Sequence, residues 1–409
     1  MVKLQRQESQ VEKTLNRRLP ILFATVMQFT VEITFTMLLQ FRLRELGASV
    51  FVISLIATVR GAMMVIGSPI WGSVADQMQY TKRLLVSLMT MSGLLFMVYV
   101  FLGLPFQFIV LTSVVSFITS GFIPIALVMS TASTDESLAR SAREISFFNA
   151  AGAIGMFQGG ILMSLLLLMI SVQMTMLVFA LLMFVAVLPA LFVKETKKSE
   201  VRRASGSLLN RILPIVSDFS PMKRNGLWAL YIGVFMRQFG IAGITALAAV
   251  YMTEEVGLTS SGAALLSSIN PGLQFFSHLY FGRLIVKIGP KKSTVLGMFL
   301  SSLTAILFGL AGNWITVSLA YLSLGFAYGA FINGAATFVA INAPRERRTE
   351  FQGLLRSFRA FGLMFGPITA GFIAEYSYLA MFLFLAVVMA ASGLLFFVFG
   401  KEKPLSIVS

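Results

Sequence analysis

Few ionisable residues interrupt the long apolar stretches of this sequence, and these few are the side chains best placed to do chemistry. Glu32 is an acid within the first such stretch, Arg60 is a base within the second, and Arg237 is a base within segment 226–252. Placing a charged side chain at the centre of a membrane-spanning helix costs about 2.5–3.5 kcal/mol, so such a residue indicates a function. We therefore predict that Glu32, Arg60 and Arg237 belong to a polar site.

Glu32 is part of a polar stripe along one helical face. Polar residues recur here at intervals of three and four, the spacing of neighbours on one side of a helix, at Thr25, Gln28, Glu32, Thr36 and Gln40. Lipid would not favour this stripe, so we expect it to face a cavity or a partner helix. Glu32 lies ~20 Å along the helix from Leu19. Arg60, ten residues after Val50 on an antiparallel segment, is predicted at a similar depth.

Three interpretations of Glu32 stay open. In the first, Glu32 carries a coupling proton: burial favours its neutral form, a neighbouring arginine favours the carboxylate, and a substrate that draws Arg60 away promotes proton uptake. In the second, Glu32 and Arg60 form a structural ion pair that only closes the helix bundle. In the third, these groups bind substrate without proton coupling, and Arg60 or Arg237 holds an anionic group, because guanidinium pairs well with carboxylate and phosphate.

The composition indicates a polytopic membrane protein. The chain has 409 residues, 57% hydrophobic and 12% charged, with a mean hydropathy of +0.85; a soluble domain carries about twice this charged share.

No cysteine and one histidine argue against a thiolate or transition-metal site. That histidine, His278, is expected to pack and hydrogen-bond, with a proton relay as the alternative. The sequence has no phosphate-binding loop. We expect no metal, no cofactor, no ATP hydrolysis and no enzymatic activity.

We predict twelve membrane-spanning helices, because a run of about 18 or more apolar residues can cross a bilayer and a helix satisfies its own backbone in lipid. The predicted spans are 19–41, 50–75, 83–103, 107–131, 147–170, 173–193, 226–252, 262–285, 293–312, 315–342, 353–375 and 378–399.

The basic residues orient these spans. Nearly all of the 32 Lys and Arg residues fall in the N-terminal tail, in segment 194–225, at the C-terminal end and beside every second loop. Positive residues accumulate on the cytoplasmic side. Both termini are therefore predicted to be cytoplasmic, in a multi-pass protein of the plasma membrane. The net charge of +15 is then a topology signal rather than a sign of nucleic-acid binding.

Residues 194–225 are rich in charge, Ser and Gly, and we predict that they form a cytoplasmic linker between an N-terminal bundle, 1–193, and a C-terminal bundle, 226–409. The flanking segments resemble each other at an offset of 210 residues: LRELGAS (43–49) aligns with TEEVGLT (253–259), and Gly72 aligns with Gly282. With one more residue of offset, GMFQGG (155–160) aligns with GPITAG (366–371). An internal repeat of this kind predicts two parallel six-helix bundles with a site at their interface.

The repeat extends the predicted site into the second half. Gln238 is the counterpart of Gln28, and Asn270 is the counterpart of Arg60. We predict a substrate cavity lined by Gln28, Glu32, Thr36, Arg60, Arg237, Gln238 and Asn270.

Short motifs at the helix ends resemble those of the major facilitator superfamily. That family's signature after the second helix is Gly-x-x-x-Asp-Arg/Lys-x-Gly-Arg/Lys-Arg/Lys. Gly72 and Asp76 match it, and the basic residues that end the signature are found slightly later in this sequence, at Lys82 and Arg83. The second half has GRLIVKIGPKK (282–292), in which the acid is replaced by valine. GPITAG resembles the Gly-Pro-x-x-Gly-Gly stretch of the family's eleventh helix. The chain departs from the family's antiporters and proton-coupled exporters at Met156, where proline is usual, and near Phe117, where arginine is frequent.

The resemblance implies an all-α integral membrane transporter in which two pseudo-symmetric six-helix bundles rock around one site. It also implies that Asp76 latches the cytoplasmic side, since an acid at a helix end can interact with a neighbouring helix N-terminus and nearby bases; an ordinary polar stop is the alternative. The predicted gating residues are Gly72, Asp76, Lys82, Arg83, Gly282, Lys287, Gly289, Gly366, Pro367 and Gly371. For the glycines, close helix packing is the alternative to gating.

We expect a monomeric secondary transporter that exports small, partly apolar organic molecules in exchange for protons. Its expected partners are this small-molecule substrate, protons and the lipid bilayer. Uptake of a polar or anionic metabolite is the first alternative, which Met156 and Phe117 keep open. A non-transporting membrane sensor on the same fold is the second.

Overall fold

The structure is a computed structural model that describes residues 2–78, 80–131, 138–193, 222–223, 226–344 and 348–401. Within this part every regular element is a helix. The helices are α1 (Val2–Glu45), α2 (Val50–Gln77), α3 (Thr81–Tyr99), α4 (Pro105–Thr119), α5 (Phe122–Thr131), α6 (Leu138–Met169), α7 (Val172–Leu191), α10 (Leu227–Glu254), α11 (Ser260–Ser267), α12 (Ile269–Ile288), α13 (Pro290–Gly309), α14 (Trp314–Asn342), α15 (Arg348–Ala374) and α16 (Tyr378–Phe399). The predicted linker lies almost wholly outside the described residues, so the division of the chain there stays a prediction.

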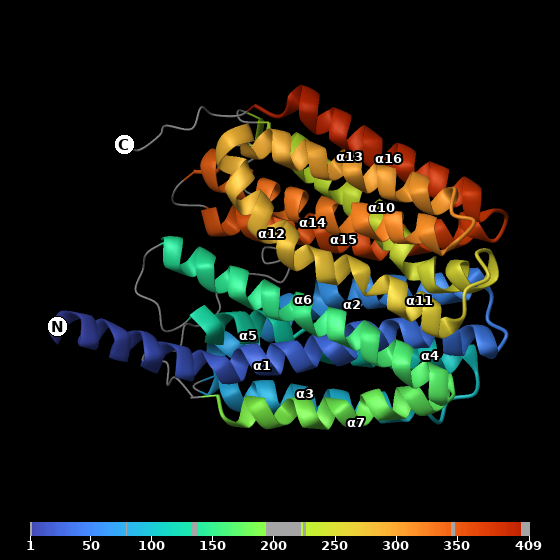
Figure 1. Ribbon diagram of the computed structural model, residues 1–409, viewed down its shortest axis with the longest axis horizontal. Coiled ribbons are helices and arrows are strands. Elements are labelled where there is room, and N and C mark those ends of the chain that lie inside the picture. Colours follow the sequence, from blue (N-terminus) through green and yellow to red (C-terminus); the bar gives the residue numbers. More distant parts are fainter. Residues whose placement is uncertain are drawn as a thin grey trace.

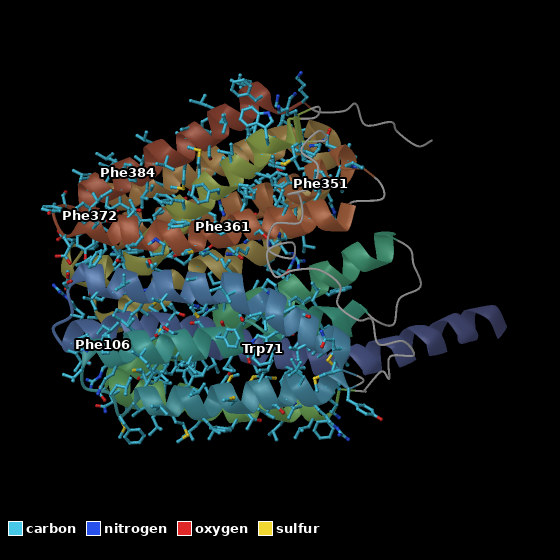
Figure 2. The ribbon with its side chains drawn as sticks, turned by 180° about the vertical axis from the view of Figure 1, so that it is seen from behind. Trp71, Phe106, Phe351, Phe361, Phe372 and Phe384 are labelled. Atoms are coloured by element: carbon cyan, nitrogen blue, oxygen red, sulfur yellow. The ribbon has the colours of Figure 1, made fainter. Side chains whose placement is uncertain are left out.

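Eleven segments are long and apolar enough to cross a membrane, and they match every predicted span except the eighth. Large apolar side chains also cover the outside of the helices. Phe106, Phe372 and Phe384, labelled in Figure 2, are 71%, 59% and 40% exposed. A soluble protein would bury side chains of this size, whereas lipid accommodates them. These features define a multi-pass helical membrane protein.

The predicted span over 262–285 is not confirmed, because this segment is not among the eleven candidate spans. This segment contains two helices, since α11 ends at Ser267 and α12 begins at Ile269. Pro271 has no backbone N–H to donate to the carbonyl of Ser267, so the hydrogen-bond ladder cannot run through this point unchanged. Twelve spans therefore remain a prediction for this part of the chain.

Two other predicted spans differ in their details. The fourth, 107–131, is divided into α4 and α5 at Ser120 and Gly121, although Pro105–Leu127 still qualifies as one span. Gly121 packs closely there, because a Cβ at this position would lie 2.7 Å from Leu88 and 2.8 Å from Trp71. The first, 19–41, is the apolar part of a longer helix, α1, which begins at Val2.

The helices run roughly parallel, and helices from the two halves of the chain lie on opposite sides of the molecule (Figure 1). We call residues 2–193 the first half and residues 226–401 the second half. Between the halves, α2 packs against α15, and α6 packs against α11 and α12. The start of α1 and the end of α16 are at one end of the molecule, which we call the terminal end (Figure 1). The opposite end, with the turns that follow Glu45, Glu254 and Ala374, is the distal end.

The turns between the helices use side-chain caps and, at both ends of the molecule, glycines with a positive φ. Five helices that begin at the distal end have a side-chain cap on a backbone N–H, which satisfies donors that the helix leaves open; the capping residues are Ser49, Ser171, Thr259, Asn313 and Ser377. At the terminal end, Gly289 joins α12 to α13 with a φ of 87°. A residue with a Cβ rarely adopts this conformation, which explains the glycine.

Candidate coupling and substrate site

Glu32 and Arg60 form an ion pair between α1 and α2. Arg60 Nη2 donates to Glu32 Oε1 at 3.1 Å, and Gln28 Nε2 donates to the second carboxylate oxygen, Oε2, at 3.3 Å. The other terminal nitrogen of Arg60, Nη1, donates to the hydroxyl of Thr36. The structure thus brings together four residues predicted to line one site, and both oxygens of the acid accept a hydrogen bond.

This cluster is mostly, but not fully, buried. The Glu32 side chain is 14% exposed and that of Arg60 is 20% exposed. An ion pair of this kind is electrically neutral, so burying it costs much less than burying either charge alone. A proton on Glu32 would remove the negative charge that balances Arg60, and would leave a neutral carboxyl group that accepts a weaker hydrogen bond. The arrangement can therefore couple the protonation of an acid to the freedom of an arginine.

Arg237 on α10 has a different environment, because all its partners are neutral. Its side chain is fully buried, at 0% exposed. Nε donates to the Ser301 hydroxyl at 2.9 Å, and Nη1 donates to Gln238 Oε1 at 3.4 Å. The guanidinium lies over the rings of Tyr328 and Phe331, 4.7 Å and 4.4 Å from their centroids. Nη2 is buried without a hydrogen-bond partner.

The predicted cavity residues thus form separate groups. Gln238 accompanies Arg237, whereas Asn270 accepts a hydrogen bond from Gln274 on its own helix, α12, at 3.0 Å. Within the described residues, no hydrogen bond or ion pair joins Glu32 or Arg60 to these second-half side chains. The role of all seven residues in substrate binding stays a prediction.

Arg359 on α15 is a further candidate that the sequence analysis did not include in the site. It precedes by one turn Gly362, where a Cβ would lie 2.8 Å from Gln238 Cβ on α10, and its Nε is buried without a hydrogen-bond partner. His278 lies 3.3 Å from Asn333 through Nδ1, and Asn333 donates to the His278 carbonyl at 2.9 Å. This pairing agrees with the expected packing role of the histidine.

The predicted gating residues near the terminal end occupy an open part of the structure. A Cβ on Gly72 or on Gly282 would meet no atom within 4 Å. Arg83 lies over the ring of Tyr80, 4.9 Å from its centroid, and Lys287 is in the last turn of α12. The Asp76 side chain is outside the described part of the structure, and so the latch stays a prediction.

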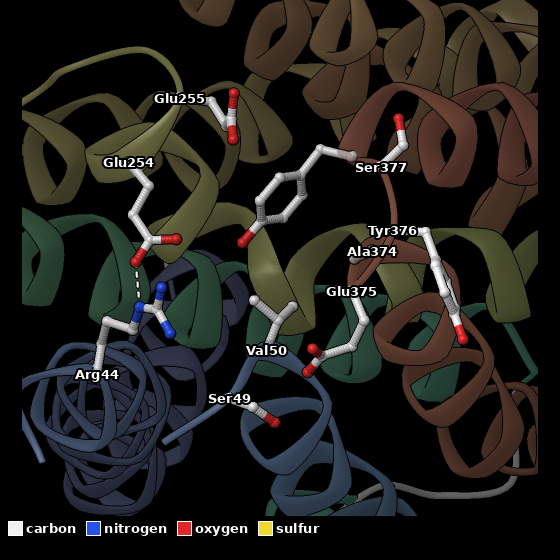
Figure 3. Close-up of a pocket in the computed structure, with 10 residues that line it drawn as sticks. Arg44, Ser49, Val50, Glu254, Glu255, Ala374, Glu375, Tyr376 and Ser377 are labelled. Atoms are coloured by element: carbon white, nitrogen blue, oxygen red, sulfur yellow. Dashed lines mark hydrogen bonds and ion pairs between the residues drawn. The ribbon is translucent and has the colours of Figure 1, made fainter. Parts of the chain in front are cut away.

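The distal end, by contrast, contains a polar pocket of about 320 Å³ between the two halves (Figure 3). Arg44 from α1 forms an ion pair with Glu254 from α10 at its rim, as the dashed line in Figure 3 marks. Glu375, at the end of α15, accepts a hydrogen bond from the backbone N–H of Phe51 at 2.7 Å. These contacts link the two halves at the distal end. They were not predicted from the sequence, although Arg44 and Glu254 align with each other at the 210-residue offset of the internal repeat.

Other links between the halves lie in the same region. Gln40 donates to the Thr245 carbonyl at 3.1 Å and accepts from the Ala249 N–H at 3.2 Å, which ties α1 to α10. Ser261 on α11 donates to the Ser164 carbonyl on α6 at 2.8 Å. Among the side chains that the structure describes, the hydrogen bonds and ion pairs that we identify between the halves are in the distal half of the molecule. The structure is therefore in a state closed at the distal end.

The fold and these buried polar groups define a helical membrane transporter, and comparison with known proteins gives its family. The family model for the Major Facilitator Superfamily matches residues 21–251 and 230–408. The chain belongs to this superfamily, as its motifs predicted. Gly366, Pro367 and Gly371 lie in the matched region, where Gly366 and Gly371 pack against Phe239 and Ser54.

Curated relatives resemble parts of the chain. The quinolone resistance protein NorA of Staphylococcus aureus is 26% identical over 172 residues, which are 42% of this chain and 43% of NorA. The proton-coupled antiporter flippase LtaA of Staphylococcus haemolyticus is 26% identical over 161 residues, 38% of this chain and 39% of LtaA. The chain therefore aligns with less than half the length of each relative.

Solved structures show the same fold at low identity. The nucleoside transporter NupG superposes with a TM-score of 0.78 over 95% of this chain and 100% of NupG, at 17% identity. A transporter of the POT family, solved with a thioalcohol-conjugated peptide, has a TM-score of 0.78 over 93% of this chain and 95% of its own, at 16% identity. At these identities the likeness establishes the fold alone.

Proposed function

We propose that this transporter exports small amphipathic organic compounds in exchange for protons, and that Glu32 carries the coupling proton. The observation that supports the proposal most is the Glu32–Arg60 pair, a partly buried acid whose two oxygens contact one arginine and one amide. The partial similarity to NorA, named for quinolone resistance, and to LtaA, named as a proton-coupled antiporter, favours export and proton coupling.

Gln28 supports a protonated state of Glu32 as well as the charged state. Its Nε2 donates to the carboxylate, while its Oε1 is buried without a partner. A half-turn of the amide would present Oε1 to Glu32 instead, and an acceptor is what a protonated carboxyl group needs. The cost of an unsatisfied buried acceptor, about 1–3 kcal/mol, would then be recovered when Glu32 binds a proton.

In the proposed cycle, proton binding at Glu32 and substrate binding alternate. This order differs from the expectation that a substrate draws Arg60 away and promotes proton uptake, because exchange requires proton and substrate to bind in turn. With the distal end closed, the substrate enters from the terminal end, which the basic residues assign to the cytoplasm, and Glu32 releases its proton while Arg60 pairs with the carboxylate. After the halves rock, Glu32 takes up a proton from the distal side, and the substrate leaves there. The free energy of the proton gradient drives export because substrate and proton favour opposite states of the pair.

The test uses purified protein in liposomes that contain a pH-sensitive dye. A mixed panel of drugs, sugars and organic acids is screened for substrate-dependent proton movement in the wild type and in Glu32→Gln. Glutamine keeps the size and hydrogen bonding of the protonated acid but cannot ionise. We expect substrate-driven proton flux in the wild type and its loss in Glu32→Gln, with substrate binding retained.

The matched control is Glu45→Gln, the same change on the same helix. Glu45 is 45% exposed and pairs only with Arg42 one turn away, so proton flux should persist. Substrate flux without proton movement, equal in the wild type and Glu32→Gln, would leave the pair as a structural contact. Inward substrate accumulation would support uptake instead, and no flux with any compound would support a non-transporting sensor.

A further inference from the structure

Two arginine sites flank the interface between the halves, and their charge balance differs. In the first half, Arg60 is neutralised by Glu32 at 3.1 Å. In the second half, no carboxylate whose side chain the structure describes forms an ion pair with Arg237 or Arg359. The second-half acids with described side chains, Glu254, Glu255 and Glu375, lie at the distal end around the pocket. The positive charge of the second-half arginines is thus left without a counter-ion from this part of the chain.

A buried cation without a counter-ion is costly, so its presence needs an explanation. Arg237 is fully buried, and its partners are a hydroxyl, an amide and two aromatic rings. These neutral contacts hold the guanidinium in place but leave Nη2 unsatisfied. Ring contacts of this kind stabilise a cation without consuming its charge, which keeps that charge available to an anion.

Arg359 is on α15, one turn before residues that pack against α10 beside Arg237: a Cβ on Gly362 would lie 2.8 Å from Gln238 Cβ. Three residues on, Gly362 packs against α10, where a Cβ would lie 2.7 Å from the Phe239 nitrogen. Four residues on, Leu363 meets Gly61 of α2. Residues three and four apart share one face of a helix, so Arg359 is on the face of α15 that meets α10 and α2. The side chain is partly exposed and its Nε is unpaired.

We propose that Arg237 and Arg359 form a subsite for an anionic group, a carboxylate, sulfonate or phosphate, on the amphipathic substrate. The inference rests on the proposed transport function, whose substrate class it specifies. Arg359 contacts the anion, and Arg237 behind it is the fixed second charge. The planar guanidinium provides two parallel donors that match such oxyanions. The apolar part of the substrate then lies toward the first half, where Arg60 is already neutralised by Glu32.

The experiment measures binding alone, in the absence of a proton gradient. The protein is placed in nanodiscs of phosphatidylcholine and titrated with dansylundecanoate, a fluorescent carboxylate, and with its neutral methyl ester; empty nanodiscs give the background. We expect the wild type to prefer the carboxylate by at least about tenfold, which corresponds to ~1.4 kcal/mol. Arg359→Gln should abolish the preference with ester binding unchanged, and Arg359→Lys should retain part of it.

The control is Arg283→Gln, which removes the same charge from an exposed position on α12. It should keep the full preference, because it lies outside the subsite. A monodisperse elution profile and unchanged ester binding show that each variant is folded. Equal binding of the two probes by the wild type, or an unchanged preference in Arg359→Gln, would overturn the subsite.

Glu32→Gln separates this inference from the proposed coupling. The variant should still prefer the carboxylate, since Glu32 makes no contact with either second-half arginine. A retained preference together with unaltered proton flux would therefore reject Glu32 as proton carrier while supporting the anionic subsite. Displacement of the probe by phosphatidylglycerol added to the nanodiscs would also support the subsite, and would assign it to a lipid headgroup rather than a soluble amphiphile.

Discussion

The interface between the two halves is built differently at its two ends. In the distal half, glycines let backbones touch: a Cβ on Gly61 would lie 2.5 Å from the carbonyl oxygen of Leu363, and one on Gly371 would overlap the Ser54 hydroxyl. Toward the terminal end, a Cβ on Gly72 or on Gly282 would meet no atom within 4 Å. The same residue type is thus in tight contact at one end and beside empty space at the other.

This difference indicates which contacts between the two halves form and separate when the halves rock. Small residues allow close approach of membrane helices, where van der Waals contact replaces the hydrophobic effect as the driving force. At the distal end that contact already exists in this structure. At the terminal end the glycines Gly72 and Gly282, which are counterparts in the repeat, have the room for such contact but no partner. We infer that they meet partners when the distal end opens, and the predictions below test this contrast.

The largest effect is expected from Gly61→Leu. The nearest atoms to the new side chain are backbone atoms of Leu363 and Met364, which cannot move aside without shifting α15. Overpacking of this kind costs about 1–3 kcal/mol, enough to change a two-state equilibrium by roughly 5–150-fold. The population should shift toward a state open at the distal end.

The absence of cysteine from the chain makes this shift simple to measure. Spin labels at Leu104→Cys and Trp314→Cys, exposed distal positions of the two halves, report their separation by pulsed electron paramagnetic resonance. The distance should increase in Gly61→Leu. Gly72→Leu is the matched control on the same helix and should leave the distal distance as in the wild type. An unchanged distance in Gly61→Leu would show that the contact does not hold the distal end closed.

A smaller effect is expected from the Arg44–Glu254 ion pair. Its side chains are 43% and 28% exposed, and exposed ion pairs contribute about 0–1 kcal/mol. Arg44→Ala and Glu254→Ala should each raise the distal-open population by up to about fivefold, and the double variant should add little to either single one. The same pair of spin labels measures the populations, and added salt should reduce the difference between variant and wild type.

The neighbouring pair Arg42–Glu45 is the control, because both residues are on α1 and do not link the halves. Arg42→Ala should leave the distal distance distribution unchanged. Equal effects of Arg42→Ala and Arg44→Ala would show a general response to charge rather than a closure. The opposite signs of Arg44 and Glu254 also matter physically, since two like charges at these repeat-related positions would repel when the halves meet.

Much of the fold was predictable because lipid imposes strong rules on sequence. Long apolar runs located eleven of the membrane-spanning segments. The break before Pro271 was not predicted, because an apolar run does not show whether its helix is continuous. Pairing of Glu32 with Arg60 was anticipated from their similar depth and from the polar face of α1. Depth and periodicity were sufficient there because the two residues are on adjacent helices.

The second-half site was less predictable for a different reason. Arg359 is near one end of its predicted span, where an arginine also follows the positive-inside rule, so its position alone does not indicate a binding role. Arg237 was identified as an intramembrane charge, but periodicity does not show whether the facing helices provide an acid. Only the packing of α13 and α14 reveals that its neighbours are Ser301, Tyr328 and Phe331.

The smallest effect on stability is expected from Gly72→Ala and Gly282→Ala. These two variants should nevertheless have a clear effect on transport. Both glycines lie inside helices with open surroundings in this state. Replacing a helical glycine by alanine in such a position stabilises a helix by up to about 1 kcal/mol, so thermal unfolding of the variants should occur at the same or a slightly higher temperature. Transport should nevertheless decrease, because the added methyl groups obstruct closure at the terminal end.

Unfolding temperature and substrate flux together test whether the two ends of the interface alternate in contact. Unfolding temperature and substrate flux in liposomes are measured for each variant and for Gly103→Ala, a distal turn position that also has no neighbour within 4 Å. Gly103→Ala should affect neither readout strongly. Full flux in Gly72→Ala and Gly282→Ala would mean that the terminal ends do not approach at these glycines, and the open space there would be a permanent feature rather than one half of a rocking cycle.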